Sequence, residues 1–291
     1  RILTGMSELR EVQVRDNVWV WGFDGDGPAA SYGANCVAVV ADAGVVLIDA
    51  LLSPAHARRV EAALRQKTDR PVRLVVLTHH HADHTWGAVH FVRQGALLVA
   101  HRACRERMAA DHPGQLAARR GQAEAAELLS EVVLVLPSLT FDQGIGVHLG
   151  VEVEVWHPGH GHTSGDAFVY LPEAGVAVCG DLVFHRYHFN YQDADLAGVR
   201  RGLEALGSLD ADVFIPGHGL PGGPELLQAQ AAYHDAVEEV VRQGLAAGKG
   251  EAEVTAELQA RFPGYGLTST LPVTYARVRE WLLRPARGGR A

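Results

Sequence analysis

The sequence predicts an α/β fold in which two sheets pack face to face with helices outside. Strand-rich and helix-containing stretches occur in both halves of the 291-residue chain, with a break near residue 145. Elements with one apolar face must bury it against another layer, which favours this arrangement. The residues alone do not separate it from another α/β layering. The length allows one large core or two smaller ones that share an interface. We expect a single domain, 1–291, with two related halves, about 1–145 and 146–291.

Strands and helices alternate in the first half. Apolar runs predict strands over 12–21, 36–40, 45–48, 73–78 and 96–100. Helices are expected over 54–67, over 85–94 and from residue 101 onward. Ser53 is a good N-cap for the first of these helices, and Pro54 suits its first turn. An Ala- and Glu-rich helical stretch over 115–130 is a candidate lid.

The second half follows the same pattern and then becomes mostly helical. One more strand is expected near the end of the first half, over 132–136, and the second half has expected strands over 147–156, 168–171, 176–179 and 213–215. Helices are expected over 196–206, 224–245, 251–261 and 274–283. There is no internal repeat and no low-complexity segment, which excludes a solenoid or repeat array.

The amino-acid composition narrows the classes of partner that the protein is expected to bind. The net charge is −8 and the pI about 6.0, which disfavours a nucleic-acid partner. No apolar stretch reaches the ~18 residues of a membrane span, so we expect no membrane partner. The partner that we expect is a small-molecule substrate, and we expect the protein to be a monomer or homodimer. Three scattered cysteines favour a reducing compartment such as the cytoplasm. No leader is evident after Arg1, but a removed signal peptide would allow a periplasmic location.

The strongest signal is a histidine-rich segment directly after an apolar strand. It has the pattern His-x-His-x-Asp-His, formed by His79, His81, Asp83 and His84. In an extended chain His79 and His81 project to the same side, so both can reach one ion. Asp83 and His84 follow where the chain turns into a helix, so they can face a second ion. Imidazole and carboxylate suit zinc, and iron or manganese also accept them. A surface polyhistidine stretch is disfavoured by the position between a strand and a helix.

Three more candidate ligands follow the ends of other apolar strands. They are His162, Asp181 and His218, each beside glycine that permits a tight turn. One such residue alone would more often be an ordinary loop residue. Three of them together with the His-x-His-x-Asp-His segment indicate one metal centre.

In this combination the sequence resembles the metallo-β-lactamase superfamily, from the strand that leads into Asp49 as far as His218. The resemblance implies an αβ/βα sandwich with metals in a groove where the sheets meet. It implies one metal on His79, His81 and His162, a second on Asp83, His84 and His218, and Asp181 between them. It also implies that Asp49 supports the ligand loop rather than binding metal. With Asp at 181 and His at 84, the set looks like glyoxalase II, lactonases, sulfatase-like members and His-rich β-lactamases, and more weakly like sulfur-oxidation-associated members.

The activity that the resemblance implies is that of a dinuclear zinc hydrolase. Two zinc ions per chain would lower the pKa of water from ~15.7 toward ~7. The resulting bridging hydroxide would attack a thioester, lactone, β-lactam or sulfate ester. Asp83 is the candidate catalytic residue, accepting a hydrogen bond from the nucleophile and carrying a proton to the leaving group. The alternative is a mononuclear non-haem iron persulfide dioxygenase that uses His79, His162 and Asp181. A nuclease and a non-catalytic metal-binding protein are disfavoured.

Substrate contacts are expected from the loops. The glycine-rich segment 22–35, with Tyr32, is a candidate flap over the groove. His185 and Tyr187 lie after the Asp181 strand and could meet substrate, with Phe189 and Tyr191 extending an aromatic wall.

Overall fold

Two sheets form the centre of the computed structural model, which describes residues 7–284. The first sheet follows chain order: β1 (Leu9–Arg15), β2 (Val18–Phe23), β3 (Asn35–Ala41), β4 (Gly44–Ile48), β5 (Val72–Val76), β6 (Leu97–His101) and β7 (Leu139–Phe141). The second has the order β12 (Val213–His218), β11 (Val176–Phe184), β10 (Phe168–Leu171), β9 (Glu152–Trp156) and β8 (Gly144–His148). The chain therefore passes from one sheet to the other between β7 and β8.

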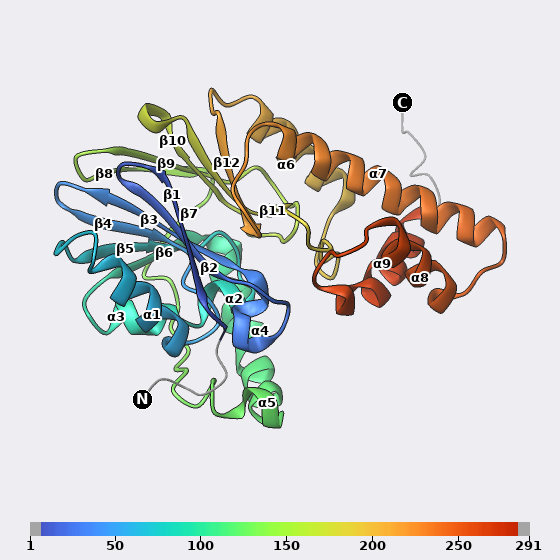
Figure 1. Ribbon diagram of the computed structural model, residues 1–291, viewed down its shortest axis with the longest axis horizontal. Helices are drawn as coiled ribbons and strands as arrows, with labels where there is room; N and C mark the ends of the chain where they lie inside the picture. The colour runs from blue at the N-terminus through green and yellow to red at the C-terminus, as the bar shows by residue number, and fades with distance from the viewer. Residues whose placement is uncertain (1–6, 285–291) are drawn as a thin grey trace.

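Helices cover the outer face of each sheet (Figure 1). The first sheet packs on α1 (Pro54–Leu64), α3 (Ala88–Val92) and α4 (Arg102–Arg120), and the second on α6 (Leu196–Gly207) and α7 (Glu225–Ala246). The inner faces share an apolar cluster that includes Val37, Ile48, Val76, Val155 and Ile215. This four-layer arrangement confirms the predicted αβ/βα sandwich.

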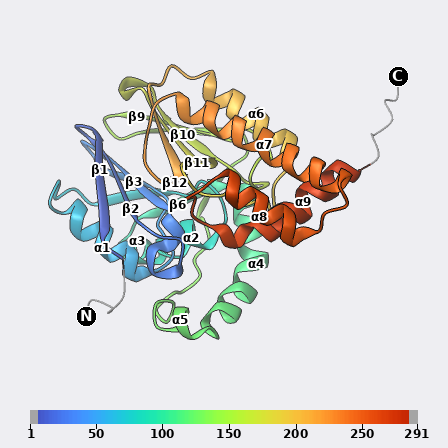
Figure 2. The ribbon, with the colours of Figure 1, turned by 45° about the vertical axis from the view of Figure 1, so that its right-hand side comes forward.

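The last two helices, α8 (Glu251–Arg261) and α9 (Leu271–Leu283), pack on α7 instead of a sheet (Figure 2). Val237, Val254 and Val278 join them in one buried cluster. That cluster also includes Phe189 from the loop after β11, so the C-terminal helices are anchored beside the carboxyl end of β11. Among residues 7–284 no helix combines the length and hydropathy needed to cross a membrane.

Short helical turns complete the chain. They are η1 (Pro28–Gly33), α2 (Ala82–Thr85), α5 (Ala123–Ala126), η2 (Pro172–Ala174) and η3 (Thr268–Thr270). The predicted helix over 85–94 is wrong in detail, since α2 and α3 are separate pieces with Gly87 between them. A Cβ on Gly87 would lie 1.9 Å from the carbonyl oxygen of Ala50, so the glycine lets the helical segment approach the end of β4.

Three predicted strands are also corrected. The segment 12–21 is a hairpin, because Asp16 and Asn17 form a turn between β1 and β2. The segment 147–156 is a hairpin as well, with Gly150 in its turn at φ 95°. The segment 132–136 forms no strand, and its Val132 carbonyl accepts a 2.6 Å hydrogen bond from Arg120. The first two segments were correctly predicted to be extended, but the turn inside each of them was missed.

Candidate metal centre

The four segments that carry the predicted ligands converge at one edge of the two sheets. The His79–His84 segment follows β5 and enters α2, and His162 lies in the loop between β9 and β10. Asp181 lies within β11, which continues past the predicted end at Cys179, and His218 is the last residue of β12. The irregularity at Gly180, with φ 54°, brings β11 against Thr78: a Cβ there would lie 2.8 Å from the Thr78 Cβ.

One group of donor atoms comes from His79, His81, His162 and Asp181, with one atom of each within 4.8 Å of the others. The Nε2 of His162 lies 2.9 Å from Nδ1 of His81 and 3.3 Å from Oδ2 of Asp181. The Nε2 of His79 lies 3.5 Å from the same carboxylate oxygen. Three imidazoles and a carboxylate therefore face a common point, as a tetrahedral zinc site requires.

A second group comes from Asp83, His84 and His218, again within 4.8 Å. The Nε2 atoms of His84 and His218 are 3.3 Å apart, and Oδ2 of Asp83 lies 3.5 Å from the latter. Asp181 reaches this group too, with Oδ1 3.2 Å from His84 and Oδ2 3.4 Å from His218. Its carboxylate thus lies between the two groups and could be shared by two ions.

The protonation states of His79, His162 and Asp181 suit cation binding. Burial lowers the pKa of His79 well below its ordinary value and that of His162 to about 3, so both rings are neutral and can donate a lone pair. Burial opposes ionisation of Asp181, but the adjacent His84 and His218 hold its pKa well below the ordinary value. Burial opposes protonation of His84, but the acids around it raise its pKa well above the ordinary value, so a metal ion would have to displace a proton from this ring. The buried Nε2 of His79 has no hydrogen-bond partner among the described residues. Donor types, charge and this unpaired nitrogen all fit a metal ion.

Asp49 supports both groups from beneath the ligand loop, which is the role that the family resemblance implied. Its carboxylate accepts hydrogen bonds from the Thr78 amide at 2.8 Å, the Thr78 hydroxyl at 2.7 Å and Nδ1 of His84 at 2.8 Å. The Thr78 hydroxyl is also 2.9 Å from Nδ1 of His79. These contacts leave the Nε2 atoms of both histidines free to face a metal. Asp49 holds this position with φ at 61°, a left-handed conformation that Asp tolerates.

Asp166 and Asp193 are supporting residues that sequence reasoning missed. Asp166 accepts from the backbone amides of His162 at 2.6 Å and Thr163 at 2.9 Å, fixing the His162 loop. Asp193 lies 3.1 Å from Nε2 of His81 and accepts a 2.9 Å bond from Arg107. Asp166 lies four residues after the predicted ligand His162, whereas no pattern in the sequence marks Asp193.

His80 and Asp193, with His81, form a third group able to hold a cation. Since His81 already presents Nδ1 to His162, its Nε2 is the atom that faces Asp193. We therefore interpret Asp193 as orienting the His81 ring. The carbonyl of His80 is 2.6 Å from Nε2 of His112, which ties the ligand loop to α4.

A cavity of about 190 Å³ opens over the second donor group. Its lining contains the predicted ligands His81, Asp83, Asp181 and His218. The other lining residues come from the flap, α2, α4, the end of β11, the loop after β11 and the C-terminal segment: Tyr32, Ala82, Gln115, Arg119, Phe184, Asn190, Gln192, Leu267, Ser269 and Thr270. Among the predicted substrate residues, Tyr32 is thus placed beside the donor groups.

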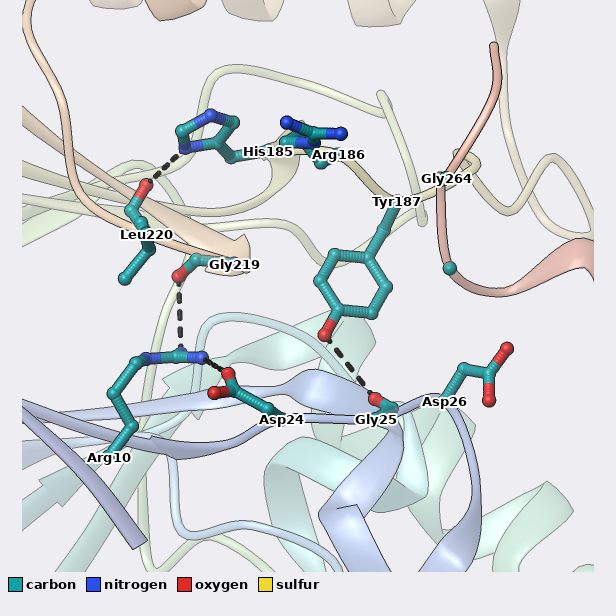
Figure 3. A pocket seen from close by; sticks show the side chains of 11 residues that line it. Arg10, Asp24, Gly25, Asp26, His185, Arg186, Tyr187, Gly219, Leu220 and Gly264 are labelled. Carbon is teal, nitrogen blue, oxygen red and sulfur yellow. Dashed lines mark hydrogen bonds and ion pairs between the residues drawn. The ribbon is translucent and has the colours of Figure 1, made fainter. Parts of the chain in front are cut away.

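His185 and Tyr187 face a different cavity, of about 330 Å³, beside the flap (Figure 3). The Tyr187 hydroxyl donates a 3.3 Å hydrogen bond to the carbonyl oxygen of Gly25. The Nδ1 atom of His185 forms a 2.8 Å hydrogen bond with the carbonyl oxygen of Leu220. The Tyr187 ring still flanks His218, with ring centroids 5.7 Å apart. Phe189 and Tyr191, expected in an aromatic wall, are buried at 0% and 1% exposure.

Comparison with known proteins agrees with the observed fold. The model of the metallo-beta-lactamase superfamily matches residues 31–218, a segment that contains all seven predicted ligands. A solved metallo-beta-lactamase from Pontibacter korlensis is 24% identical, with a TM-score of 0.62 over 78% of this chain and 99% of that one. The metallo-beta-lactamase FIM-1 from Pseudomonas aeruginosa, in its mono-zinc form, is 20% identical, with a TM-score of 0.63 over 79% and 96%. These two structures share the fold with this chain.

One curated relative carries a different activity in its name. The chain is 29% identical over 187 residues to the 2,4-dinitroanisole O-demethylase subunit alpha of Nocardioides sp. (strain JS1661). The match covers 62% of this chain and 51% of the relative, so the chain spans about half the length of that curated protein. Helices α7 to α9 lie beyond the segment that the family model matches.

Proposed function

This chain belongs to the metallo-β-lactamase superfamily, and on that premise we propose that it is a dinuclear zinc hydrolase acting on a small ester-like substrate. The observation that carries the proposal is the position of Asp181 between two complete donor groups. Thioesters, lactones, β-lactams and sulfate esters are the candidate substrates. A cavity of about 190 Å³ supports a small molecule over a polymer.

The residues present fit two ions. His79, His81 and His162 would hold the first, Asp83, His84 and His218 the second, and Asp181 would contact both. Metal bound in this way lowers the pKa of water and polarises the bond under attack. Most of the donor residues are buried, and the low dielectric constant around them strengthens their electrostatic contacts to the substrate.

Asp83 is proposed to handle the proton. Its side chain is 15% exposed and lines the cavity, whereas the Asp181 side chain is 4% exposed. Asp83 can therefore accept a hydrogen bond from an attacking water and deliver the proton to the departing atom. Asp49 and Asp193 keep His84 and His81 in the required tautomers and ring positions.

The test is turnover of nitrocefin, an acyl-homoserine lactone, S-lactoylglutathione and an aryl sulfate by zinc-loaded protein. We expect hydrolysis of at least one class, with its loss in a folded His81→Ala variant. Full turnover by His81→Ala would refute the mechanism. Metal analysis of the native protein separates the alternative: two zinc per chain supports hydrolysis, and one iron supports a persulfide dioxygenase.

A second candidate is hydrolysis of an activated aryl methyl ether, which the O-demethylase relative favours. In that reaction the oxygen of water bonds to the ring carbon that carries the methoxy group. The bond from that carbon to the methoxy oxygen breaks, and methanol leaves with a proton. Release of dinitrophenol from 2,4-dinitroanisole, followed by its absorbance, tests this candidate.

A further inference from the structure

One basic residue, Arg119, lines the cavity beside the donor groups, and its side chain forms no hydrogen bond or ion pair with another described residue. Arg119 lies in the last turn of α4, and Gln115 lines the same cavity one turn earlier. The next residue, Arg120, donates hydrogen bonds to the carbonyls of Leu129, Ser130 and Val132. Arg120 therefore anchors the segment after α5, and Arg119 is left for the cavity.

The guanidinium of Arg119 is held by aromatic rings and meets no acceptor. Its Cζ lies 5.4 Å from the ring centroid of Trp86 and 5.7 Å from that of Tyr32. Within residues 7–284 no group accepts a hydrogen bond from this side chain or pairs with it, and its Nη1 is buried and unpaired. A guanidinium fixed in this way, with donors unsatisfied, is prepared for a planar acceptor such as carboxylate.

The other residues that line the cavity leave Arg119 without a competing carboxylate partner. Arg119 is the one Lys or Arg in the described cavity wall, and the two acids there are the proposed metal ligands Asp83 and Asp181. With those acids committed to metal, no carboxylate of the wall competes for Arg119. The remaining polar groups, including Gln115, Asn190 and Thr270, are neutral.

From these observations we infer that Arg119 is the recognition residue for a carboxylate on the substrate, so that the enzyme prefers small anionic esters or lactones. The inference rests on the proposed hydrolase function and names its substrate class. Arg119 binds the carboxylate while the scissile group lies over Asp83 and His218. It is a specificity residue and takes no part in bond breaking.

The experiment compares two isosteric esters, mono(4-nitrophenyl) succinate and 4-nitrophenyl 4-methylpentanoate, in zinc-loaded protein. Arg119→Met preserves packing on Trp86 and removes the charge. We expect it to lower kcat/KM for the anionic ester 10- to 100-fold, mainly through KM, and to change the neutral ester less than about 3-fold. Arg119→Lys should be intermediate, because an ammonium cannot make the paired bonds of a guanidinium. The control is Arg279→Met, an exposed arginine of α9 with the same change in net charge.

Calorimetry provides a readout that needs no turnover. Succinamate, an anion, should bind the wild type at least 10-fold more tightly than Arg119→Met, whereas neutral succinamide should not discriminate. Equal succinamate affinity in both proteins, or equal losses for both esters, would overturn the inference. If neither ester is hydrolysed but succinamate binding still depends on Arg119, the anion site stands and the proposed hydrolysis fails.

Discussion

Replacement of Asp49 by Asn is the sharpest test of how the fold controls the donor groups. The Asp49 carboxylate accepts three hydrogen bonds, two from Thr78 and one from Nδ1 of His84. The amide of Asn keeps one acceptor oxygen, and its NH2 group replaces Oδ2, which accepts from both the Thr78 hydroxyl and the His84 Nδ1–H. The Thr78 hydroxyl can rotate to accept from the amide, whereas the Nδ1–H of His84 is left facing a donor. Asn also tolerates the left-handed backbone at this position, so little backbone strain is added.

The expected cost is one charge-assisted hydrogen bond, about 1.5–3 kcal/mol. That energy corresponds to roughly 10- to 100-fold weaker zinc binding, concentrated at the site of Asp83, His84 and His218. A competition titration with a chromogenic zinc chelator measures both affinities. The control is Asp69→Asn, which removes an exposed carboxylate from the loop before β5. Asp49→Asn protein that binds two zinc ions with wild-type affinities would refute the reasoning.

Three further predictions concern other parts of the chain. Asp193→Asn should weaken zinc binding at the His79, His81 and His162 site about 10-fold in the same titration, since the carboxylate bonded to His81 is lost; unchanged affinity would contradict it. Ile48→Ala removes a side chain buried between the sheets and should lower the unfolding free energy by about 3 kcal/mol in urea denaturation; a loss below about 1 kcal/mol would be inconsistent with that burial. Burial lowers the pKa of His56 to about 4, below the ~6.5 of an unfolded chain, so the unfolded state binds more protons and stability falls as the pH drops from about 6.5 toward 4. At pH 5 the protonation of His56 in the unfolded state should lower the unfolding free energy by about 2 kcal/mol relative to neutral pH. A His56→Gln variant whose stability has the same pH dependence as that of the wild type would contradict this prediction.

The sequence predicted the layers because buried strands have an obvious apolar signature. The strand over 45–48 and the helix over 251–261 were located to within a residue at each end. The turns at Asp16 and Gly150 were missed because a run of alternating residues continues across each hairpin. Local pattern does not reveal where such a run reverses direction.

The donor groups were foreseen because ligand types stand at the ends of apolar strands. Asp193 and Arg119 were missed for a physical reason: their importance depends on packing between distant segments. Asp193 meets His81 across 112 positions of sequence, and Arg119 meets Tyr32 only after α4 folds beside the flap. His185 and Tyr187 were predicted to contact substrate because they lie close to Asp181 in the sequence. In the structure they line a different cavity from the one beside Asp181, so closeness in sequence was not enough to place them at the donor groups.

The most direct measurement is anomalous diffraction at the zinc edge from crystals of zinc-loaded protein. We predict two peaks on either side of the Asp181 carboxylate, one among His79, His81 and His162 and one among Asp83, His84 and His218. A peak confined to the His80 and Asp193 group, or no peak within coordinating distance of Asp181, would contradict the central claim.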